Sequence, residues 1–263
     1  MKDKIKNASR RTLALFAAAL LALGAGSIMS ARAVLNIVSD TFDTNLKMAN
    51  VMEVTILEGK DNDVVDAGAS AAILKALKDA DGNAVNVIPG KVYDETLAVK
   101  NNSGRPMYVR MIVRKYWLDK NGKEDAGLDP SLIKLTYKGS DFNGDDWIKN
   151  DNEDTPSGES STYYYKNLLP GSEDGNSDTD LLFDQLKIDA SVAAREKDPV
   201  VTKEDGKTIF TYVYKYDGCA FYIEADVQAI QGHNAQEAIE SQWCPDIAAT
   251  YDLASDSGSL ELK

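Results

Sequence analysis

An acidic stretch near the middle of the chain holds the residues best suited to binding a cation. A run of six residues beginning at Asp141 reads Asp-Phe-Asn-Gly-Asp-Asp, and the side-chain oxygens of Asp141, Asn143 and Asp145 have the spacing of positions 1, 3 and 5 of a calcium loop. However, Asp146 stands where such a loop requires glycine, and Asn152 replaces the glutamate of position 12. This argues against an EF-hand. An acidic loop without an ion is favoured over a loosely held Ca²⁺.

The sequence offers little for catalysis. His233 is the sole histidine, so a zinc site of the HExxH type is excluded. It lies between Gly232 and Asn234 in a polar turn, with no GxSxG nucleophile signature nearby. With 42 Asp and Glu residues, some pair will always have the spacing of a glycoside hydrolase, so acidic pairs carry no information. The sequence therefore predicts a protein that is not an enzyme and has no cofactor.

Two cysteines, Cys219 and Cys244, are the remaining reactive side chains. In an exported chain they can form a disulfide, and free thiols are the alternative. No CxxC motif points to a metal or redox role.

The first 33 residues have the organisation of an export signal. Basic residues precede an apolar run, Leu13–Leu23, and Ala31 and Ala33 provide the small side chains that signal peptidase accepts at positions −3 and −1. Residues 1–33 are thus predicted to be a cleavable signal peptide, and the mature protein is expected to be secreted. A retained anchor is the weaker interpretation, because Gly24 and Gly26 leave the run short of the ~20 residues that span a bilayer. An alternative twin-arginine signal at residues 10–11 would imply export of a folded protein.

After cleavage the chain is strongly acidic. Residues 34–263 contain 23 basic and 41 acidic residues, a formal net charge of −18. This charge repels nucleic acid and anionic lipid, so neither is an expected partner. Solubility and cation binding both remain explanations for it.

The elements that must position these residues are mostly strands. Met107–Trp117 alternates two sets of side chains along its length and is the clearest strand. Further strands are predicted at 51–57, 92–100, 132–137, 162–168, 181–190, 208–216 and 220–230, with the last two paired through a turn at 217–218. Short helices are predicted at 69–79 and 234–243, the latter capped by Asn234.

About eight strands separated by turns predict an all-β fold, an antiparallel β-sandwich of jelly-roll or Greek-key type with short decorating helices. We assign residues 34–248 to a single β-sandwich domain and residues 249–263 to an acidic, flexible tail.

Several short motifs, in their order along the chain, resemble the TasA/camelysin family of secreted Gram-positive proteins. They lie at residues 24–27, 51–57, 88–91, 107–110, 162–165, 169–171 and 227–231. The resemblance implies a jelly-roll-like sandwich released by a SipW-type signal peptidase. It also implies assembly into biofilm-matrix fibres in which each subunit donates its N-terminal segment as a strand to the next, with a minor homologue as a nucleating partner. The chain departs from the family in a longer start at 34–40 and in insertions at 61–87 and 139–161.

The segment that would follow the signal peptide has residues suited to strand donation. Val34, Leu35, Ile37 and Val38 form a β-prone apolar set within the candidate donor strand, 34–43. Strand addition gains affinity from main-chain hydrogen bonds, and a head-to-tail contact that does not close on itself propagates as a filament. The competing interpretation is that these residues pair within their own sheet as an ordinary first strand.

Two other functions remain open at the level of sequence. A monomeric secreted adhesin would bind its ligand through the loop around Trp147 or through aromatic residues at 162–168, although burial in a core is the commoner fate of such a run. A camelysin-like protease is disfavoured by the single histidine.

Overall fold

The computed structural model describes residues 53–60, 63–66, 70–72, 86–173, 175–196, 198–204, 207–255 and 257–263. All of these belong to one compact unit, Ala49–Lys263. The predictions for the signal peptide, for the cleavage site at Ala31 and Ala33, and for the assembly strand of Val34, Leu35, Ile37 and Val38 fall outside the described residues.

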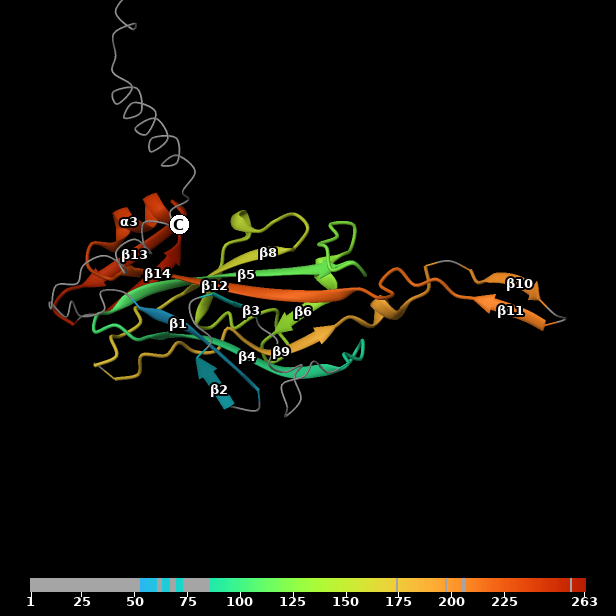
Figure 1. Cartoon of the computed structure of the whole chain (residues 1–263). Coiled ribbons are helices and arrows are strands. Elements are labelled where there is room, and N and C mark those ends of the chain that lie inside the picture. The colour runs from blue at the N-terminus through green and yellow to red at the C-terminus, as the bar shows by residue number, and fades with distance from the viewer. Residues whose placement is uncertain are drawn as a thin grey trace, which may run out of the picture. The chain divides into compact units, whose positions relative to one another are not determined.

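Two five-stranded sheets form the body of this unit (Figure 1), and the strands paired within them are antiparallel. The first sheet has the order β2-β1-β4-β9-β6, made of β1 (Val54–Lys60), β2 (Asp63–Asp66), β4 (Val92–Asn101), β6 (Ile133–Thr136) and β9 (Phe183–Ile188). The second has the order β3-β12-β5-β8-β7, made of β3 (Ser70–Ala72), β5 (Met107–Leu118), β7 (Trp147–Lys149), β8 (Ser160–Tyr165) and β12 (Ala220–Gln231). The predicted all-β, antiparallel fold is confirmed, and the jelly-roll order remains a prediction.

The main core lies between the two sheets. It contains Ile56 and Leu97 from the first sheet and Met111 and Ile223 from the second, all nearly inaccessible to solvent. Because side chains alternate along a strand, the residues directly before and after each of these point to the opposite face of the same sheet. The alternation of β5 therefore places Met107, Val109, Met111 and Val113 in this core.

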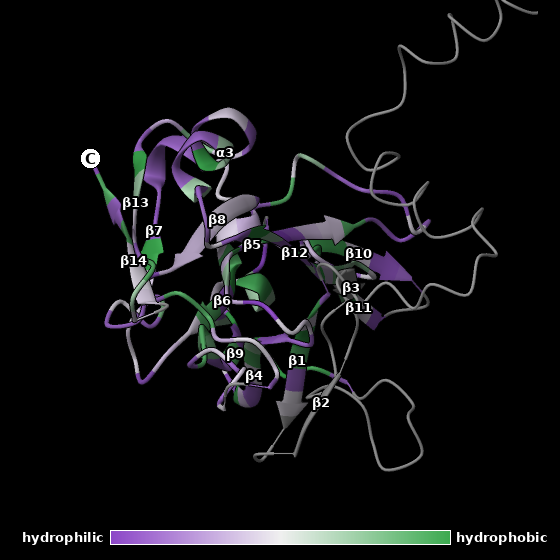
Figure 2. Cartoon of the chain, turned by 90° about the vertical axis from the view of Figure 1, so that its left-hand side faces the viewer, coloured by the Kyte–Doolittle hydropathy of each residue, from purple (hydrophilic) through white to green (hydrophobic). Residues whose placement is uncertain are grey.

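A second cluster covers the outer face of the second sheet. It is formed with α3 (Ala235–Gln242), β13 (Ile247–Asp252) and β14 (Ser257–Leu262), which lie beside β5 and β8 in Figure 2. Tyr108 of β5 and Tyr164 of β8 belong to this cluster. The hydroxyl of Tyr108 donates to the backbone oxygen of Thr250. As a result, the first part of β5 is buried on both faces.

The prediction of a flexible tail at 249–263 is therefore wrong. β13 and β14 pair in register from Ile247↔Leu262 to Asp252↔Ser257, and Leu260 is 1 % exposed. The physical reason is that Ile247 and Leu260 pack against Ile239 of α3, so a polar, serine-containing hairpin is fixed by two apolar contacts.

The two predicted helices have different outcomes. The helix predicted at 234–243 is confirmed as α3. Asn234 stands at its N-cap, but with φ of 56° and without a side-chain capping bond, so the predicted capping interaction is not made. Of the segment 69–79, the described residues 70–72 form β3 rather than a helix. The described residues also include three short 3-10 helices: η2 (Pro130–Leu132), η3 (Asp151–Glu153) and η4 (Ala190–Ala193).

A separate two-stranded sheet consists of β10 (Val200–Glu204) and β11 (Lys207–Thr211), drawn in orange in Figure 1. The predicted pairing of 208–216 with 220–230 is therefore wrong, because β11 pairs with β10 whereas β12 pairs with β5 and β3. A turn at residues 215–218, in which Gly218 has φ of 73°, separates the two segments. Glycine adopts this left-handed conformation without strain.

Candidate assembly surface

The outer edge of β12 is the feature of the sandwich best suited to accepting another strand. On its inner side, β12 pairs with β5 along all 12 of its residues. On its outer side it pairs with β3, and only at Glu224, Ala225 and Asp226. Within the described ranges, no other strand pairs with this side, so the main chain at 220–223 and 227–231 has no strand partner there. Such an edge presents N–H and C=O groups to any strand that can align with it.

The neighbouring edge of the first sheet is also partly open. On one side, β1 pairs with β4 from Val54 to Gly59. On its other side, β1 pairs with β2 only from Leu57 to Lys60, so residues 54–56 have no strand partner there among the described residues. The strands β1 and β12 lie close to each other across the two sheets. The two partly covered edges are therefore on the same side of the sandwich, and β1 is the first described strand after the candidate donor segment 34–43 in the sequence.

The other sheet edges are less suitable for strand addition. They are formed by β6, with 4 residues, and β7, with 3 residues. Very short edge strands are a common way of preventing unwanted pairing. Of the four edges of the two five-stranded sheets, the β12 side offers the longest run of main chain without a strand partner among the described residues.

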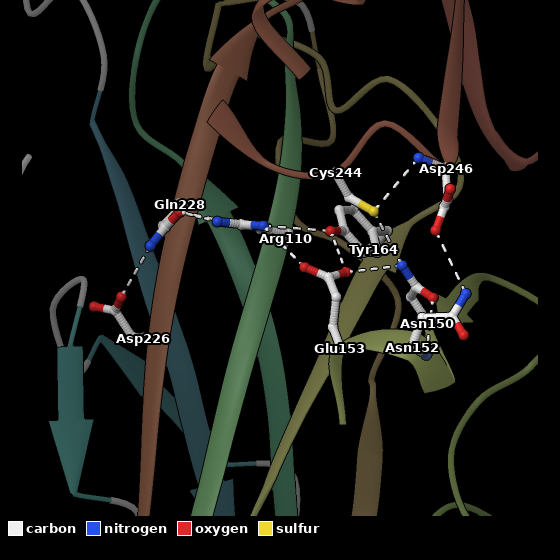
Figure 3. Close-up of polar contacts among 9 residues, drawn as sticks. All are labelled: Arg110, Asn150, Asn152, Glu153, Tyr164, Asp226, Gln228, Cys244 and Asp246. Atoms are coloured by element: carbon white, nitrogen blue, oxygen red, sulfur yellow. Dashed lines mark hydrogen bonds and ion pairs between the residues drawn. The ribbon is translucent and has the colours of Figure 1, made fainter. Parts of the chain in front are cut away.

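Side chains on the outer face of the second sheet hold this part of β12 in place (Figure 3). Arg110 of β5 stands directly opposite Gln228 of β12 on one side and Tyr164 of β8 on the other. Its Nε and Nη2 donate to Gln228 Oε1 at 3.1 and 2.9 Å, and its Nη1 donates to the hydroxyl of Tyr164 at 3.3 Å. Gln228 Nε2 in turn donates to Asp226 Oδ2 at 3.4 Å. The register of β12 is thus fixed by side chains as well as by the main chain.

The same network continues into the segment that follows α3, at Cys244 and Asp246 (Figure 3). Glu153 Oε2 accepts hydrogen bonds from the hydroxyl of Tyr164 at 2.6 Å and from Asn150 Nδ2 at 3.0 Å, and Glu153 Oε1 lies 3.5 Å from Arg110 Nη1. Burial, and then the bond to Glu153, raises the pKa of Tyr164 well above its ordinary value. The guanidinium also lies 5.2 Å from the ring centre of Trp243. These contacts join β5, β8, β12 and the segment after α3 into one rigid region.

No role for Arg110 or Gln228 is predicted from the sequence. The available signal was an arginine with apolar residues on both sides, Val109 and Met111, in the middle of the clearest strand. A charged side chain in such a place needs buried partners, and these come from parts of the chain far away in sequence.

The possible disulfide between Cys219 and Cys244 is not formed, since both thiols are free. Cys219 directly precedes β12, whereas the Sγ of Cys244 accepts a bond from Asn150 Nδ2 at 3.3 Å, beside the network around Gln228. The nine positions between Cys219 and Gln228 correspond to roughly 30 Å of extended strand. A disulfide requires Cα atoms within about 7 Å of each other, so the two cysteines of one chain cannot pair.

The candidate calcium residues Asp141, Asn143 and Asp145 share one loop, in which Asn143 and two backbone oxygens already have partners. Asn143 is buried, and its Nδ2 donates to Asp146 Oδ2 at 3.0 Å and to the backbone oxygen of Leu181 at 2.9 Å. The ammonium of Lys166 donates to the backbone oxygens of Gly144 and Asp145 at 2.6 and 2.7 Å. No cluster of three His, Cys, Asp or Glu side chains suited to a metal occurs among the described residues. The arrangement lends the calcium interpretation no support.

The aromatic residues that the adhesin hypothesis requires are buried. Trp147 is 1 % exposed and its Nε1 donates to the backbone oxygen of Asp180 at 3.0 Å. Tyr163, Tyr164 and Tyr165 are each less than a tenth exposed. His233 is exposed and lies edge-on to Tyr251 in the turn before α3. None of these rings in β7 and β8 presents a face to a ligand.

None of the helices in the part of the chain described here is both long and apolar enough to cross a bilayer. The chain was compared with models of protein families, with curated proteins and with solved structures, and none of the three comparisons gave a match.

Proposed function

We propose that this chain is a secreted, non-enzymatic structural protein that assembles head to tail into extracellular, biofilm-matrix-like fibres. In this proposal, cleavage after Ala33 frees the segment 34–43, which adds as a strand to the sandwich of the next copy. The observation that supports it most directly is the outer edge of β12, where strand pairing among the described residues is limited to Glu224–Asp226.

The chemistry of such an addition is simple. The donated main chain would satisfy N–H and C=O groups along β12, and the alternating side chains of Val34, Leu35, Ile37 and Val38 would set its register. The partly open edge of β1 lies close by, so an added strand would approach both sheets. Donor and acceptor are different surfaces of one molecule, and each added copy therefore exposes a new acceptor.

The resemblance of the sequence to the TasA/camelysin family supports the same proposal, including a jelly-roll order of strands, a self-assembling partner and a minor homologue that nucleates the fibre. The adhesin alternative lost its candidate contact residues when Trp147 and the tyrosines of β8 proved to be buried. The protease alternative rests on His233 alone, and this residue is exposed in a turn.

Electron microscopy of two forms of the protein tests the mechanism. Protein beginning at Val34 is expected to form filaments, and protein beginning at Thr44 is expected to form none. A third form, in which Val34, Leu35, Ile37 and Val38 are all replaced by serine, should also form none, whereas a matched form with Asn36 and Ser39 replaced by threonine should form filaments. Filaments from both starting points, or from neither, would remove the donated-strand mechanism.

Hydrogen exchange tests the acceptor edge. A synthetic peptide of residues 34–43 is added in excess to protein beginning at Thr44, and amide protection is measured by mass spectrometry. Protection is expected to rise at 227–231 of β12 and to stay unchanged at β6, which serves as the control edge. Protection confined to β6, or none at all, would exclude β12 as the acceptor.

A further inference from the structure

The sheet of β10 and β11, together with the three residues 212–214 that follow it, carries most of the large apolar side chains that the described structure exposes. Of 12 such residues, seven lie in the short stretch 200–214. They are Val200, Val201, Ile209, Phe210, Tyr212, Val213 and Tyr214, with exposed fractions between 38 % and 57 %. We refer to residues 200–204 and 207–214 as the arm.

Both faces of the arm are accessible. Cross-strand partners share a face, so Val201 and Phe210 lie on one side and Thr202 and Ile209 on the other. All ten residues of β10 and β11 are exposed, and the arm is drawn away from the two large sheets (Figure 1). With about half of each side chain accessible, the seven apolar residues present on the order of 600 Å². Summed over both faces of the arm, this area is comparable with the largest apolar patches of ordinary monomers.

The arm is nevertheless held firmly at its base. The guanidinium of Arg195 lies 4.1 Å from the ring centre of Tyr212, and the amide of Glu196 donates to the backbone oxygen of Val213 at 2.9 Å. Below it, the ring of Tyr216 packs 4.8 Å from that of Trp117 in the sandwich. An isolated two-stranded sheet is only marginally stable in water, so a sheet presented in this way gains most from a partner that extends it.

Charge indicates that the partner is a second copy of the chain. Residues 200–214 contain Lys203, Glu204, Asp205 and Lys207 as their only charged residues, a net charge of zero, whereas the rest of residues 34–263 carries −18. Two copies therefore repel each other everywhere except where near-neutral surfaces meet. Contact between two arms keeps the acidic sandwiches apart.

Of the two arm strands, β11 is the better edge for pairing. β11 has a single charged residue, Lys207 at its start, and it continues into the uncharged stretch 208–214, which holds five of the seven exposed apolar side chains. β10 carries Lys203 and Glu204, and charged side chains on an edge strand oppose pairing.

We propose that the arms of two copies join through their β11 edges, antiparallel and related by a two-fold axis, to form one four-stranded sheet. The contact uses the same surface on both molecules, so it stops at two copies. It is independent of the proposed strand donation at the N-terminus. If both contacts operate, the donated strand builds the filament and the arms link neighbouring filaments side by side.

Sedimentation of protein beginning at Thr44, which lacks the donor segment, tests the arm alone. The unaltered protein is expected to show a dimer whose fraction rises with concentration. Phe210→Asp should weaken dimerisation at least tenfold, and Leu253→Asp should leave it unchanged, because Leu253 is 72 % exposed in the β13–β14 turn and places the same charge outside the arm. Circular dichroism verifies that all three proteins are folded. A monomer at every concentration, or a Phe210→Asp protein that dimerises normally, would overturn the proposal.

Cross-linking tests the two-fold geometry. In a Cys219→Ser background, Ile209→Cys is expected to form a disulfide-linked dimer under mild oxidation, whereas Leu253→Cys is not. A link at Leu253 and none at Ile209 would refute arm-to-arm pairing. Micrographs of protein beginning at Val34 separate the two proposals: dimers without filaments would leave the arm contact standing and remove strand donation, and single filaments that never associate would do the reverse.

Discussion

Gln228 Oε1 lies 2.9 and 3.1 Å from two nitrogens of Arg110, directly across the β5–β12 pair. The arginine is thereby oriented so that its remaining nitrogen reaches the hydroxyl of Tyr164 and the carboxylate of Glu153. Arg110, in the middle of β5, thus connects the sandwich to the segment that follows α3. It also holds β12, the strand whose outer edge we propose as an acceptor.

Replacing Arg110 with alanine is expected to destabilise the protein by about 3 kcal/mol, because Glu153 would lose its cation and Gln228 its donors in a largely buried place. Arg114→Ala is the matched control on the same face of β5. Its side chain is 37 % exposed and its ion pairs are screened by water, so we expect a loss below about 1 kcal/mol. Urea denaturation measures both, and equal losses would show that the buried network contributes nothing special.

The C-terminal hairpin offers a second matched pair. Leu260→Ala removes a side chain that is 1 % exposed in the second cluster and should cost about 2–5 kcal/mol. Leu262→Ala, on the same strand but 47 % exposed, should cost no more than about 0.5 kcal/mol. Thermal or urea unfolding distinguishes the two. If neither substitution has an effect, the hairpin is not part of the folded unit.

Gly171 is expected to be intolerant of any side chain. A Cβ atom at this position would lie 2.8 Å from the backbone nitrogen of Arg105 and the carbonyl carbon of Gly104, and backbone cannot move aside as a side-chain tip can. Gly171→Ala should therefore lose about 1–3 kcal/mol of stability. At Gly144 the nearest atoms to a new Cβ are 4.0 Å away, so Gly144→Ala should be within about 0.5 kcal/mol of the unaltered protein.

The pair of Lys134 and Asp189 predicts a dependence of stability on pH. The ammonium of Lys134, 2.6 Å away, and then the amide of Ser191 lower the pKa of the Asp189 carboxyl well below its ordinary value of 3.8. A lowered pKa means that the stabilisation is complete above about pH 4 and is lost as the pH falls through the folded-state value. Asp189→Asn should accordingly flatten the decline in stability between about pH 4 and pH 2.

A carboxyl titration by NMR provides the control for this pair. In Lys134→Met, the pKa of Asp189 should move back toward its ordinary value, because the main cause of the shift is gone. An unchanged pKa in this variant would mean that the Ser191 amide alone sustains the shift.

Thiol labelling examines the two cysteines. In the native protein, Cys219 is partly accessible and Cys244 is buried, so iodoacetamide should add to one site before unfolding and to both in urea. Burial raises the pKa of Cys219, so labelling should be slow at pH 7 and accelerate as the pH rises. If the unlabelled protein has a mass two hydrogen atoms below that of the reduced chain and takes up no label in urea, the two cysteines form an intramolecular disulfide.

Local patterns predicted individual strands well. The alternation in 107–117 identified β5, and Pro89-Gly90, where Gly90 has φ of 86°, was recognised as a turn before β4. These features are encoded within ten or so residues. The pairing partner of a strand is not encoded locally. For this reason the sequence predicted that 208–216 pairs with 220–230, whereas β11 pairs with β10.

The C-terminal hairpin and the Arg110 network were missed for a related reason. In β14, Leu260 is the one deeply buried residue among serines, a glycine and a glutamate, so the strand has the composition of a linker. In the network, Arg110, Glu153 and Gln228 are far apart in sequence, and only the folded sheet places them together. The long-range contacts that build the candidate assembly surface leave no local pattern.

The twelve continuous pairs between β5 and β12 have a mechanical consequence for a fibre. A pulling force applied along β12 acts parallel to both strands. The hydrogen bonds between β5 and β12 are then loaded in shear, and they share the load. A strand pulled from one end across the ladder would instead unzip bond by bond at much lower force. The long β5–β12 register would thus make the sandwich a stiff link in any chain of subunits joined through that edge.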